Sequence, residues 1–130
     1  MTTVSISSFG YKHGLPPESS GGHVFDCRAL PNPYWEESLR RFTGCDAPIV
    51  DFMNAHADAV CAFMLPVRQL VQLSLRAYER DGRETLSVAF GCTGGQHRSV
   101  YCAEALAEFL RSCEDVDVKL VHTAQKWWKT

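Results

Sequence analysis

One short segment of the chain combines residue types that suit the binding of an anion. Residues 91–99 read GCTGGQHRS. The adjacent glycines Gly94 and Gly95 allow the backbone to adopt positive φ and to bring its N–H groups close to a ligand. Hydroxyl, amide, imidazole and guanidinium donors surround them. The candidate ligand-binding residues of this segment are Thr93, Gly94, Gly95, Gln96, His97, Arg98 and Ser99.

The chemistry that these residues favour is the binding of a phosphate group. A helix is predicted to begin directly after the glycines, and its first amides are unpaired and lie at the positive end of the helix dipole. Arg98 adds a two-pronged cation, and His97 donates more strongly when it is protonated. The alternative is a tight turn that needs only the glycines, with Arg98 in solvent. The concentration of donors within so few residues favours the anion site.

The segment also has a C-x5-R spacing between Cys92 and Arg98, which resembles the phosphate loop of cysteine-dependent phosphatases. In those enzymes a thiolate attacks phosphorus at the N-terminus of a helix. Two departures weaken the resemblance. Gly91 stands where a histidine is usual, and no general acid is identified beyond guesses at Asp26 and Asp46. We prefer to interpret Cys92 as a small buried residue that ends a strand, so no catalytic residue is assigned.

Alternating strands and helices are expected to position this segment. Strands are predicted at Thr3–Ser7, His23–Leu30, Thr85–Phe90 and Val116–His122. Helices are predicted at Ala47–Arg80 and Gln96–Ser112, with a helical turn at Tyr34–Phe42 and a long loop at Phe9–Gly22. Pro66 is expected to split or kink the longer helix. These elements predict one α/β domain over residues 1–130, with a mostly parallel sheet of four or slightly more strands flanked by helices. Ligands of such sheets bind beyond the carboxyl ends of the strands, which places residues 91–99 at the binding edge.

Five further candidates lie near or after the ends of the first two predicted strands. Asp26 and Arg28 lie two residues apart near a strand end and so share one face, and Asn32 follows just before a proline. An aspartate beside an arginine either binds sugar hydroxyls and phosphate or forms an ion pair that supports the loop. Lys12 and His13, on a glycine-flanked loop, either close over a ligand or lie in solvent.

Composition limits the classes of protein to which the chain can belong. It has 130 residues, a hydrophobic fraction of 45% and a formal net charge of -2, which suits one packed domain and argues weakly against a general nucleic-acid binder. No apolar run reaches membrane-spanning length and the N-terminus lacks a secretory signal, so we expect a cytoplasmic protein without a membrane association. The 6 cysteines include no CxxC pair, so neither a zinc site nor any other metal or cofactor is predicted.

Four segments of the chain together resemble the C-terminal domain of the RapZ family of RNase adapter proteins. They are Ser8–Pro16, Val24–Trp35, Leu39–Ile49 and Gly91–Leu110. They occur in the family's order over almost the full length, and GCTGGQHRSV is the most specific run.

This resemblance implies an α/β fold similar to part of phosphofructokinase. It implies a site for an amino-sugar phosphate, glucosamine-6-phosphate in enteric members, and binding of small RNA that is presented to ribonuclease E by an oligomer. The implied sugar-phosphate residues are Thr93, Gly94, Gly95, His97 and Arg98. A family histidine is also implied to match His56, whose helical position by itself equally suggests a surface residue.

The chain departs from the family at two places. It contains no G-x-x-x-x-G-K-[ST] motif, so nucleotide hydrolysis by the family's N-terminal half is not carried over, and a stand-alone domain is expected. Only Lys126 and Lys129 follow the last predicted strand, where the family often has a basic run that suits RNA. Trp127 and Trp128 either stack on bases or pack on the protein, and packing is preferred because the chain is net negative.

The leading hypothesis is a sensor that binds a phosphorylated metabolite, either an amino-sugar phosphate or a nucleotide sugar. The segment around Arg98 holds the phosphate, and Asp26, Asn32 and His56 contact the sugar. The alternatives are an RNA-binding adapter for ribonuclease-dependent regulation and a phosphatase that uses Cys92. A binding module is favoured over an enzyme.

Overall fold

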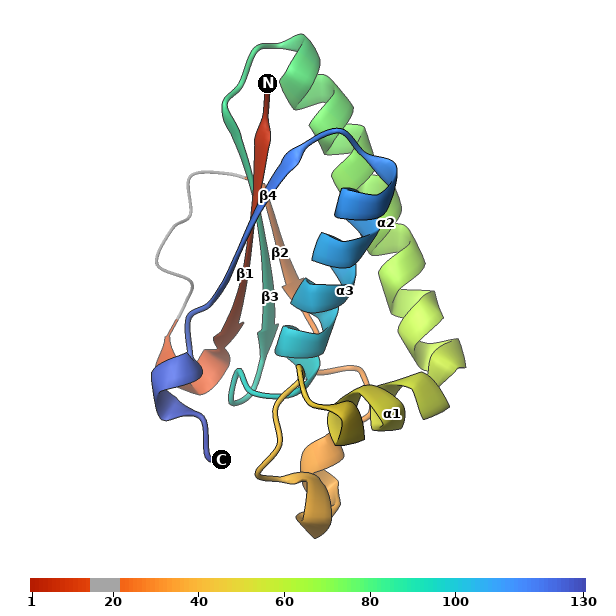
Figure 1. The fold of residues 1–130 in the computed structure, drawn as a ribbon, viewed down its shortest axis with the longest axis vertical. Coiled ribbons are helices and arrows are strands. Elements are labelled where there is room, and N and C mark those ends of the chain that lie inside the picture. Colours follow the sequence, from red (N-terminus) through yellow and green to blue (C-terminus); the bar gives the residue numbers. More distant parts are fainter. Residues whose placement is uncertain (15–21) are drawn as a thin grey trace.

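A parallel four-stranded sheet forms the centre of the molecule (Figure 1). The computed structural model describes residues 1–14 and 22–130, so residues 15–21 of the loop predicted over Phe9–Gly22 lie outside the described residues. The strands are β1 (Thr3–Gly10), β2 (His23–Asp26), β3 (Thr85–Cys92) and β4 (Asp117–His122). Their order is β2-β3-β1-β4, and every neighbouring pair is parallel. The predicted α/β fold with a parallel sheet is confirmed.

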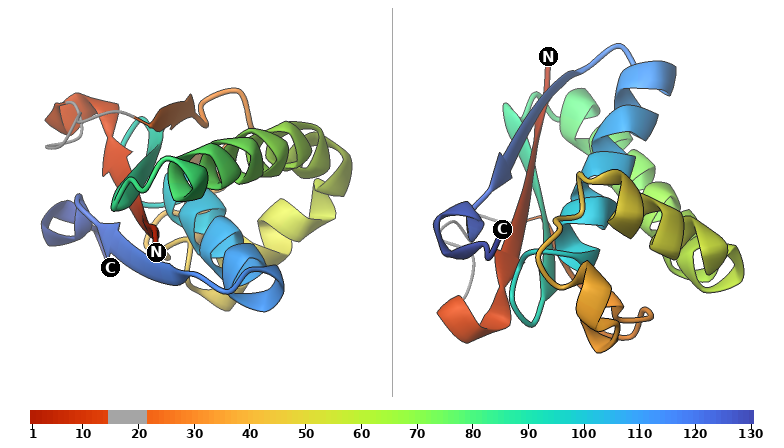
Figure 2. Two further views of the ribbon diagram at one scale, coloured as in Figure 1. Left: turned by 90° about the horizontal axis from the view of Figure 1, so that it is seen from above. Right: turned by 60° about the horizontal axis from the view of Figure 1, so that its bottom comes forward.

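The α-helices of the described residues cover one side of this sheet. They are α1 (Ala47–Ala55), α2 (Ala57–Arg80) and α3 (Arg98–Cys113). Both views of Figure 2 place them on the same side, where α3 packs across β1, β3 and β4 while α2 packs beside β3. Short 3-10 helices occupy the connections: η1 (Tyr11–His13), η2 (Pro33–Trp35), η3 (Glu37–Leu39) and η4 (Gln125–Trp127). The helical turn predicted around residues 34–42 is thus a pair of 3-10 turns.

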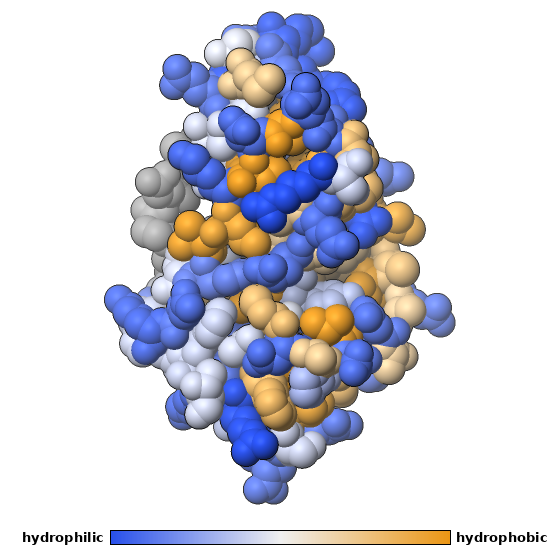
Figure 3. All heavy atoms as spheres, in the orientation of Figure 1, coloured by the Kyte–Doolittle hydropathy of each residue, from blue (hydrophilic) through white to orange (hydrophobic). Residues whose placement is uncertain are grey.

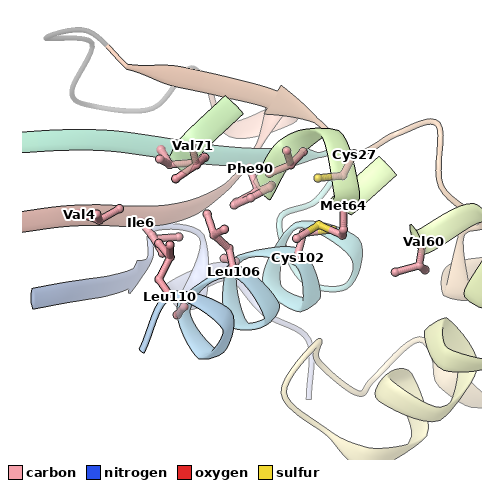
Figure 4. Close-up of a cluster of buried hydrophobic side chains, with 14 of the residues drawn as sticks. Val4, Ile6, Cys27, Val60, Met64, Val71, Phe90, Cys102, Leu106 and Leu110 are labelled. Atoms are coloured by element: carbon pink, nitrogen blue, oxygen red, sulfur yellow. The ribbon is translucent and has the colours of Figure 1, made fainter. Parts of the chain in front are cut away.

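The hydrophobic core lies between the sheet and the helices (Figure 4). Val4 and Ile6 of β1 are at most 1% exposed, because alternate residues of a strand point to the same face. Leu106 and Leu110, one helical turn apart on α3, meet them and are fully buried. Each such side chain contributes about 1.5–3 kcal/mol by leaving water. This packing fixes α3, and with it the helix start that follows the glycine-rich loop.

The long helical region divides at His56 and not at Pro66. The predicted split at Pro66 is wrong, since α2 continues through that residue, while a kink there stays a prediction. Pro66 removes one backbone hydrogen bond, but its neighbours Met64 and Val67 are each 2% exposed and hold the helix against the core. His56 instead has φ -107 and ψ 43, so it lies outside the helical region and lets the chain change direction.

The second strand is shorter than predicted. The sequence predicted a strand to Leu30, but β2 ends at Asp26. The Asp26 carboxylate accepts the backbone N–H of Arg28 at 2.9 Å, and the N–H of Leu30 bonds to the Cys27 carbonyl at 3.1 Å. The N–H of Cys27 still donates to the Gly91 carbonyl of β3 at 2.7 Å. Beyond Cys27 these local turns take the place of strand pairing, and short acidic side chains often stabilise such turns.

The strand order creates a crevice at the carboxyl ends of β1 and β3. These strands are neighbours, yet the chain leaves β1 toward β2 on one side and leaves β3 toward β4 on the other. The two connections therefore run in opposite directions along the sheet, and adjacent strands with opposite connections form the usual ligand-binding position of parallel sheets. The predicted binding edge and this crevice therefore coincide.

The outer surface mixes polar and apolar side chains. On the face drawn in Figure 3, apolar groups are interspersed with hydrophilic ones. Among the described residues, no helix has both the length and the apolar character needed to cross a membrane.

Candidate functional site

A cavity of about 700 Å³ opens at the carboxyl ends of the strands. Its walls come from η1, the β2–η2 connection, the segment before α1, the glycine-rich loop and the C-terminal tail. The lining residues are Lys12, His13, Asn32, Tyr34, Arg40, Arg41, Cys92, Thr93, Gly94, Gln96, His97, Arg98, Trp127, Lys129 and Thr130. Segments that are far apart in the sequence thus meet around the loop that the sequence singled out.

The glycine-rich loop is held against the end of β1 by very close backbone contacts. Gly95 has φ +71, and a Cβ there would lie 2.7 Å from the Gly10 nitrogen. A Cβ on Gly10 would in turn lie 2.6 Å from the carbonyl carbon of Gly94. The backbone N–H of Lys12 donates to the Thr93 carbonyl at 3.1 Å. These glycines are needed for close approach, while Gly94 itself faces the cavity.

Arg98 is the first residue of α3 and is 5% exposed. Its Nη1 donates to the carbonyls of Arg28 and Leu30, at 2.9 and 3.1 Å. Its Nε is buried and has no hydrogen-bond partner among the described residues. The guanidinium is therefore anchored at one nitrogen beside the cavity, in a position where an anion would satisfy part of its remaining donors.

His97, directly before α3, is 6% exposed and lines the same cavity. Burial lowers the pKa of its imidazole below the ordinary value, and the carbonyls of Phe42 and Arg40 offset this only in part. Its Nε2 is buried and has no partner in the described part of the chain. A neutral imidazole with a free ring nitrogen can serve a ligand as donor or acceptor.

We expect the protein to lose stability as the pH falls from about 7 to about 5, in part because of His97. Its folded-state pKa lies below the ordinary histidine value of 6.5, so the unfolded chain binds more protons below that pH. The stabilisation that neutral His97 contributes is fully present above pH 6.5 and is lost as the pH falls toward the folded-state pKa. Urea unfolding of wild type and His97→Gln at both pH values tests this. An equally steep pH dependence in His97→Gln contradicts it; some dependence should persist, because burial also lowers the pKa of His23.

Gln96 connects the loop to two other walls of the cavity. Its Nε2 donates to the carbonyls of Phe42 and Lys129, both at 3.0 Å, and its Oε1 accepts the N–H of Lys129 at 3.0 Å. Trp128 adds a hydrogen bond from Nε1 to the Gly95 carbonyl at 2.8 Å. The Gln96 amide is thus engaged with protein groups although it was predicted to bind ligand. The preferred interpretation of the tryptophan pair, packing on the protein, agrees with this contact.

Lys12, His13 and Asn32 line the cavity, and local contacts hold the last two. Lys12 belongs to η1 and is exposed. The ring of His13 stacks on Trp127 with centroids 4.0 Å apart. The side chain of Asn32 accepts the N–H of Tyr34 at 3.1 Å and caps η2.

Cys92 ends β3 and is 3% exposed. Its Sγ lies 3.1 Å from Ser99 Oγ and receives the Ser99 backbone N–H at 3.4 Å. The prediction of a small buried residue at a strand end is confirmed, and Ser99 supports this thiol from outside the cavity lining. Neither Asp26 nor Asp46 lines the cavity, so the general acid that a phosphatase needs stays unidentified. The phosphatase alternative stays a prediction.

Five predicted ligand residues are not part of the cavity lining: Gly95 and Ser99 of the loop, and Asp26, Arg28 and His56. Asp26 and Arg28 form an exposed ion pair at 2.8 Å, and the guanidinium of Arg28 stacks 4.0 Å over Tyr11. This is the loop-supporting arrangement that the sequence left open as an alternative. His56 is exposed at the α1–α2 junction, with Nδ1 2.9 Å from the Phe52 carbonyl. Its place in the fold is a helix end rather than a cavity wall.

Several lining residues were missed by sequence reasoning. Tyr34, Arg40 and Arg41 come from the 3-10 region, and Trp127 and Lys129 come from the tail. Arg40 is fixed by a hydrogen bond from Nε to the Tyr34 carbonyl at 2.7 Å and by stacking on the Tyr34 ring. The adjacent residues Arg40 and Arg41, close to the Pro31-Asn32-Pro33 turn, were the sequence signal for a second source of positive charge at this site.

The cavity is strongly positive although the chain is not. Its lining side chains include the cations Lys12, Arg40, Arg41, Arg98 and Lys129 and, among the described residues, no carboxylate. The whole chain has a formal net charge of -2. A concave surface that collects one sign of charge concentrates ions of the other sign. The arrangement can bind a multiply charged anion with an attached polar or ring-shaped group.

Comparison with known proteins matches most of the chain to one family. The model of the RapZ C-terminal domain matches residues 2–126. The RNase adapter protein RapZ of Sodalis glossinidius is 47% identical over 110 residues, which are 85% of this chain and 38% of that protein. The nucleotide-binding protein HEAR2885 of Herminiimonas arsenicoxydans is 46% identical over 117 residues, 90% of this chain and 40% of that protein. The chain therefore spans about two fifths of the length of these relatives.

Proposed function

The chain belongs to the family of RapZ C-terminal domains, and from this premise we propose that it is a regulatory module that binds a phosphorylated metabolite. An amino-sugar phosphate or a nucleotide sugar is the proposed ligand class. The observation that carries the proposal is the cavity at the β1–β3 crevice, whose lining side chains supply five cations.

The dimensions and chemistry of the cavity support this ligand class. Its volume of about 700 Å³ falls within the range of small-molecule sites. The phosphate is proposed to lie against Thr93, Gly94 and Arg98, where loop donors and a guanidinium converge. The rings of Tyr34 and Trp127 and the amide of Asn32 then face the remainder of the ligand. Aromatic faces suit the apolar faces of sugar and base rings.

The proposed regulatory role uses the connections between loop and tail. Gln96 and Gly95 are bonded to Lys129 and Trp128, so a ligand that orders the loop would also order the tail. Several relatives are named RNase adapter proteins. We therefore propose a ribonuclease or an RNA as a partner of this chain as well. Assembly as an oligomer stays a prediction.

Calorimetric titration with matched pairs of ligands tests the proposed function. We expect a sugar phosphate or nucleotide sugar to bind and the same sugar without phosphate to bind at least about tenfold more weakly, because charge-assisted hydrogen bonds are lost. Glucosamine with and without its 6-phosphate is the first pair. Equal affinity for both members of every pair would contradict the proposed phosphate site. A rise in melting temperature with the phosphorylated member provides an independent readout.

RNA is the second candidate ligand, favoured by cations and exposed aromatic side chains in the same region. Trp35 is 77% exposed, and the Lys126 ammonium lies 4.4 Å over the Trp127 ring. Such groups bind phosphates and stack on bases. A gel-shift series with structured RNA distinguishes this role, since RNA affinity falls steeply with salt. The absence of binding at low salt counts against it and leaves the metabolite proposal unaffected.

A further inference from the structure

Three side chains with metal-binding atoms converge at a place separate from the cavity. Cys45 precedes α1, Glu104 lies on α3 and His122 ends β4. Their ligand atoms all lie within 4.8 Å of one another. None of the three lines the cavity. Because 18 or more residues separate any two of them along the chain, only the folded structure brings this thiol, carboxylate and imidazole together.

The imidazole of His122 is already oriented as a metal ligand. Its Nδ1 lies 2.6 Å from Ser8 Oγ, and Ser8 is fully buried at the end of β1. When Nδ1–H donates to this hydroxyl, Nε2 carries the lone pair and faces Glu104 Oε2 at 2.7 Å. Metal-binding histidines typically donate their second ring N–H to such a supporting group, which fixes tautomer and ring orientation.

The donor set matches zinc in both type and spacing. Zinc in proteins is bound by cysteine, histidine and carboxylate, with ligand distances near 2.0–2.3 Å. Tetrahedral donors at such distances lie about 3.3–3.8 Å from one another. The present separations, from 2.7 Å between His122 and Glu104 up to 4.8 Å, reach these values with side-chain movements of about 1 Å. Three protein ligands leave a fourth position for water or another group.

The three groups also lie close enough to share one cation. The Glu104 carboxylate faces the His122 ring at 2.7 Å, and the Cys45 thiol lies within 4.8 Å of both. A simple ion pair between His122 and Glu104 accounts for two of the groups and gives Cys45 no role, whereas a metal ion gives a role to all three.

We propose that Cys45, Glu104 and His122 form a binding site for a divalent transition-metal ion, with zinc as the preferred occupant. The ion joins the Thr43–Asp46 turn, α3 and β4. Arg40 and Arg41 lie just before that turn and Lys129 follows β4, so the ion braces two walls of the positive cavity. The site goes beyond metabolite binding and does not depend on it.

Titration of the full chain with Co²⁺ alone, in a buffer free of thiol reductants, tests the site. We expect one equivalent to produce visible bands of tetrahedral cobalt and a thiolate-to-cobalt charge-transfer band, which Zn²⁺ then abolishes. Cys45→Ser should remove the charge-transfer band and weaken zinc binding at least about tenfold. Cys113→Ser is the matched control, since Cys113 is exposed and outside the cluster, and it should bind as wild type.

Several results would overturn the proposal. The first is the absence of a thiolate-to-cobalt band in wild type. The second is a band that survives in Cys45→Ser. The third is a loss of the band or of zinc affinity in Cys113→Ser as large as in Cys45→Ser. Glu104→Gln supplies a test that does not use cysteine chemistry: it should weaken zinc binding at least about tenfold while the far-ultraviolet circular dichroism is unchanged. Zinc affinity equal to wild type in Glu104→Gln would also contradict the site. Phosphate-ligand binding, measured separately, distinguishes failure here from failure of the cavity proposal.

Discussion

Replacing Arg98 with alanine is expected to weaken the binding of a sugar phosphate by about 1.5–3 kcal/mol, roughly ten- to hundredfold. The guanidinium lines the cavity at the start of α3, and its buried Nε has no protein partner among the described residues. The same change should lower the free energy of unfolding by about 2–4 kcal/mol, because two backbone carbonyls lose a charged donor. Those carbonyls belong to Arg28 and Leu30. Calorimetric titration measures the first effect and urea unfolding the second.

Two further variants separate these effects. Arg98→Lys keeps the positive charge but lacks the two-pronged donor geometry of the guanidinium. It should therefore bind the sugar phosphate more tightly than Arg98→Ala and more weakly than wild type. Arg41→Ala removes an exposed cation from the cavity wall and should weaken binding while leaving the free energy of unfolding close to wild type. Wild-type affinity in a folded Arg98→Ala protein would show that the phosphate does not lie at the start of α3. Binding measurements are restricted to temperatures at which circular dichroism shows each variant to be folded.

Gly95→Ala is expected to lower the free energy of unfolding by about 2–5 kcal/mol, the combined cost of positive φ and of overpacking. The new Cβ would lie 2.7 Å from Ala124 Cβ and from the Gly10 nitrogen, at φ +71. Neither neighbour can withdraw easily, since one is the β1 backbone and the other is buried below the tail. The loop must therefore move away from β1, and the cavity with it.

Gly94→Ala is the matched control for this prediction. Its φ is not positive, and the nearest side-chain atom to a new Cβ is Lys12 Cε at 3.8 Å. We expect urea unfolding of Gly94→Ala to resemble that of wild type. Equal destabilisation by the two substitutions would show that the close contact at Gly95 does not govern the loop.

Much of the fold could be predicted because periodicity reports burial. The alternation in Thr3–Ser7 and the i, i+4 pattern of Leu106 and Leu110 placed a strand and a helix that the structure confirms. The split at Pro66, one of the two predicted outcomes, was mispredicted because a proline's local cost can be offset by core contacts on either side. Local propensity cannot weigh that compensation.

Part of the candidate site could be predicted because its residues are close together in the sequence. Thr93, Gly94, His97 and Arg98 fall within residues 93–98, so their spacing alone indicated a common site, and all four line the cavity. The helical position of His56 left open whether this side chain meets a ligand or solvent, and the structure places it at a helix end outside the cavity lining. The amide of Gln96 lines the cavity as predicted, but its contacts with the backbone carbonyls of Phe42 and Lys129 depend on the fold and could not be predicted.

By itself the sequence determined the parallel α/β architecture and the glycine-rich loop at a strand end, since both depend on residues that are neighbours along the chain. Only the tertiary structure decided which distant side chains join that loop. Arg40, Arg41 and Lys129 reach the cavity, and Cys45 meets Glu104 and His122, through packing between separate segments. The physical reason is that a local pattern encodes which face of an element is buried, while the relative placement of elements follows from the packing of the whole core.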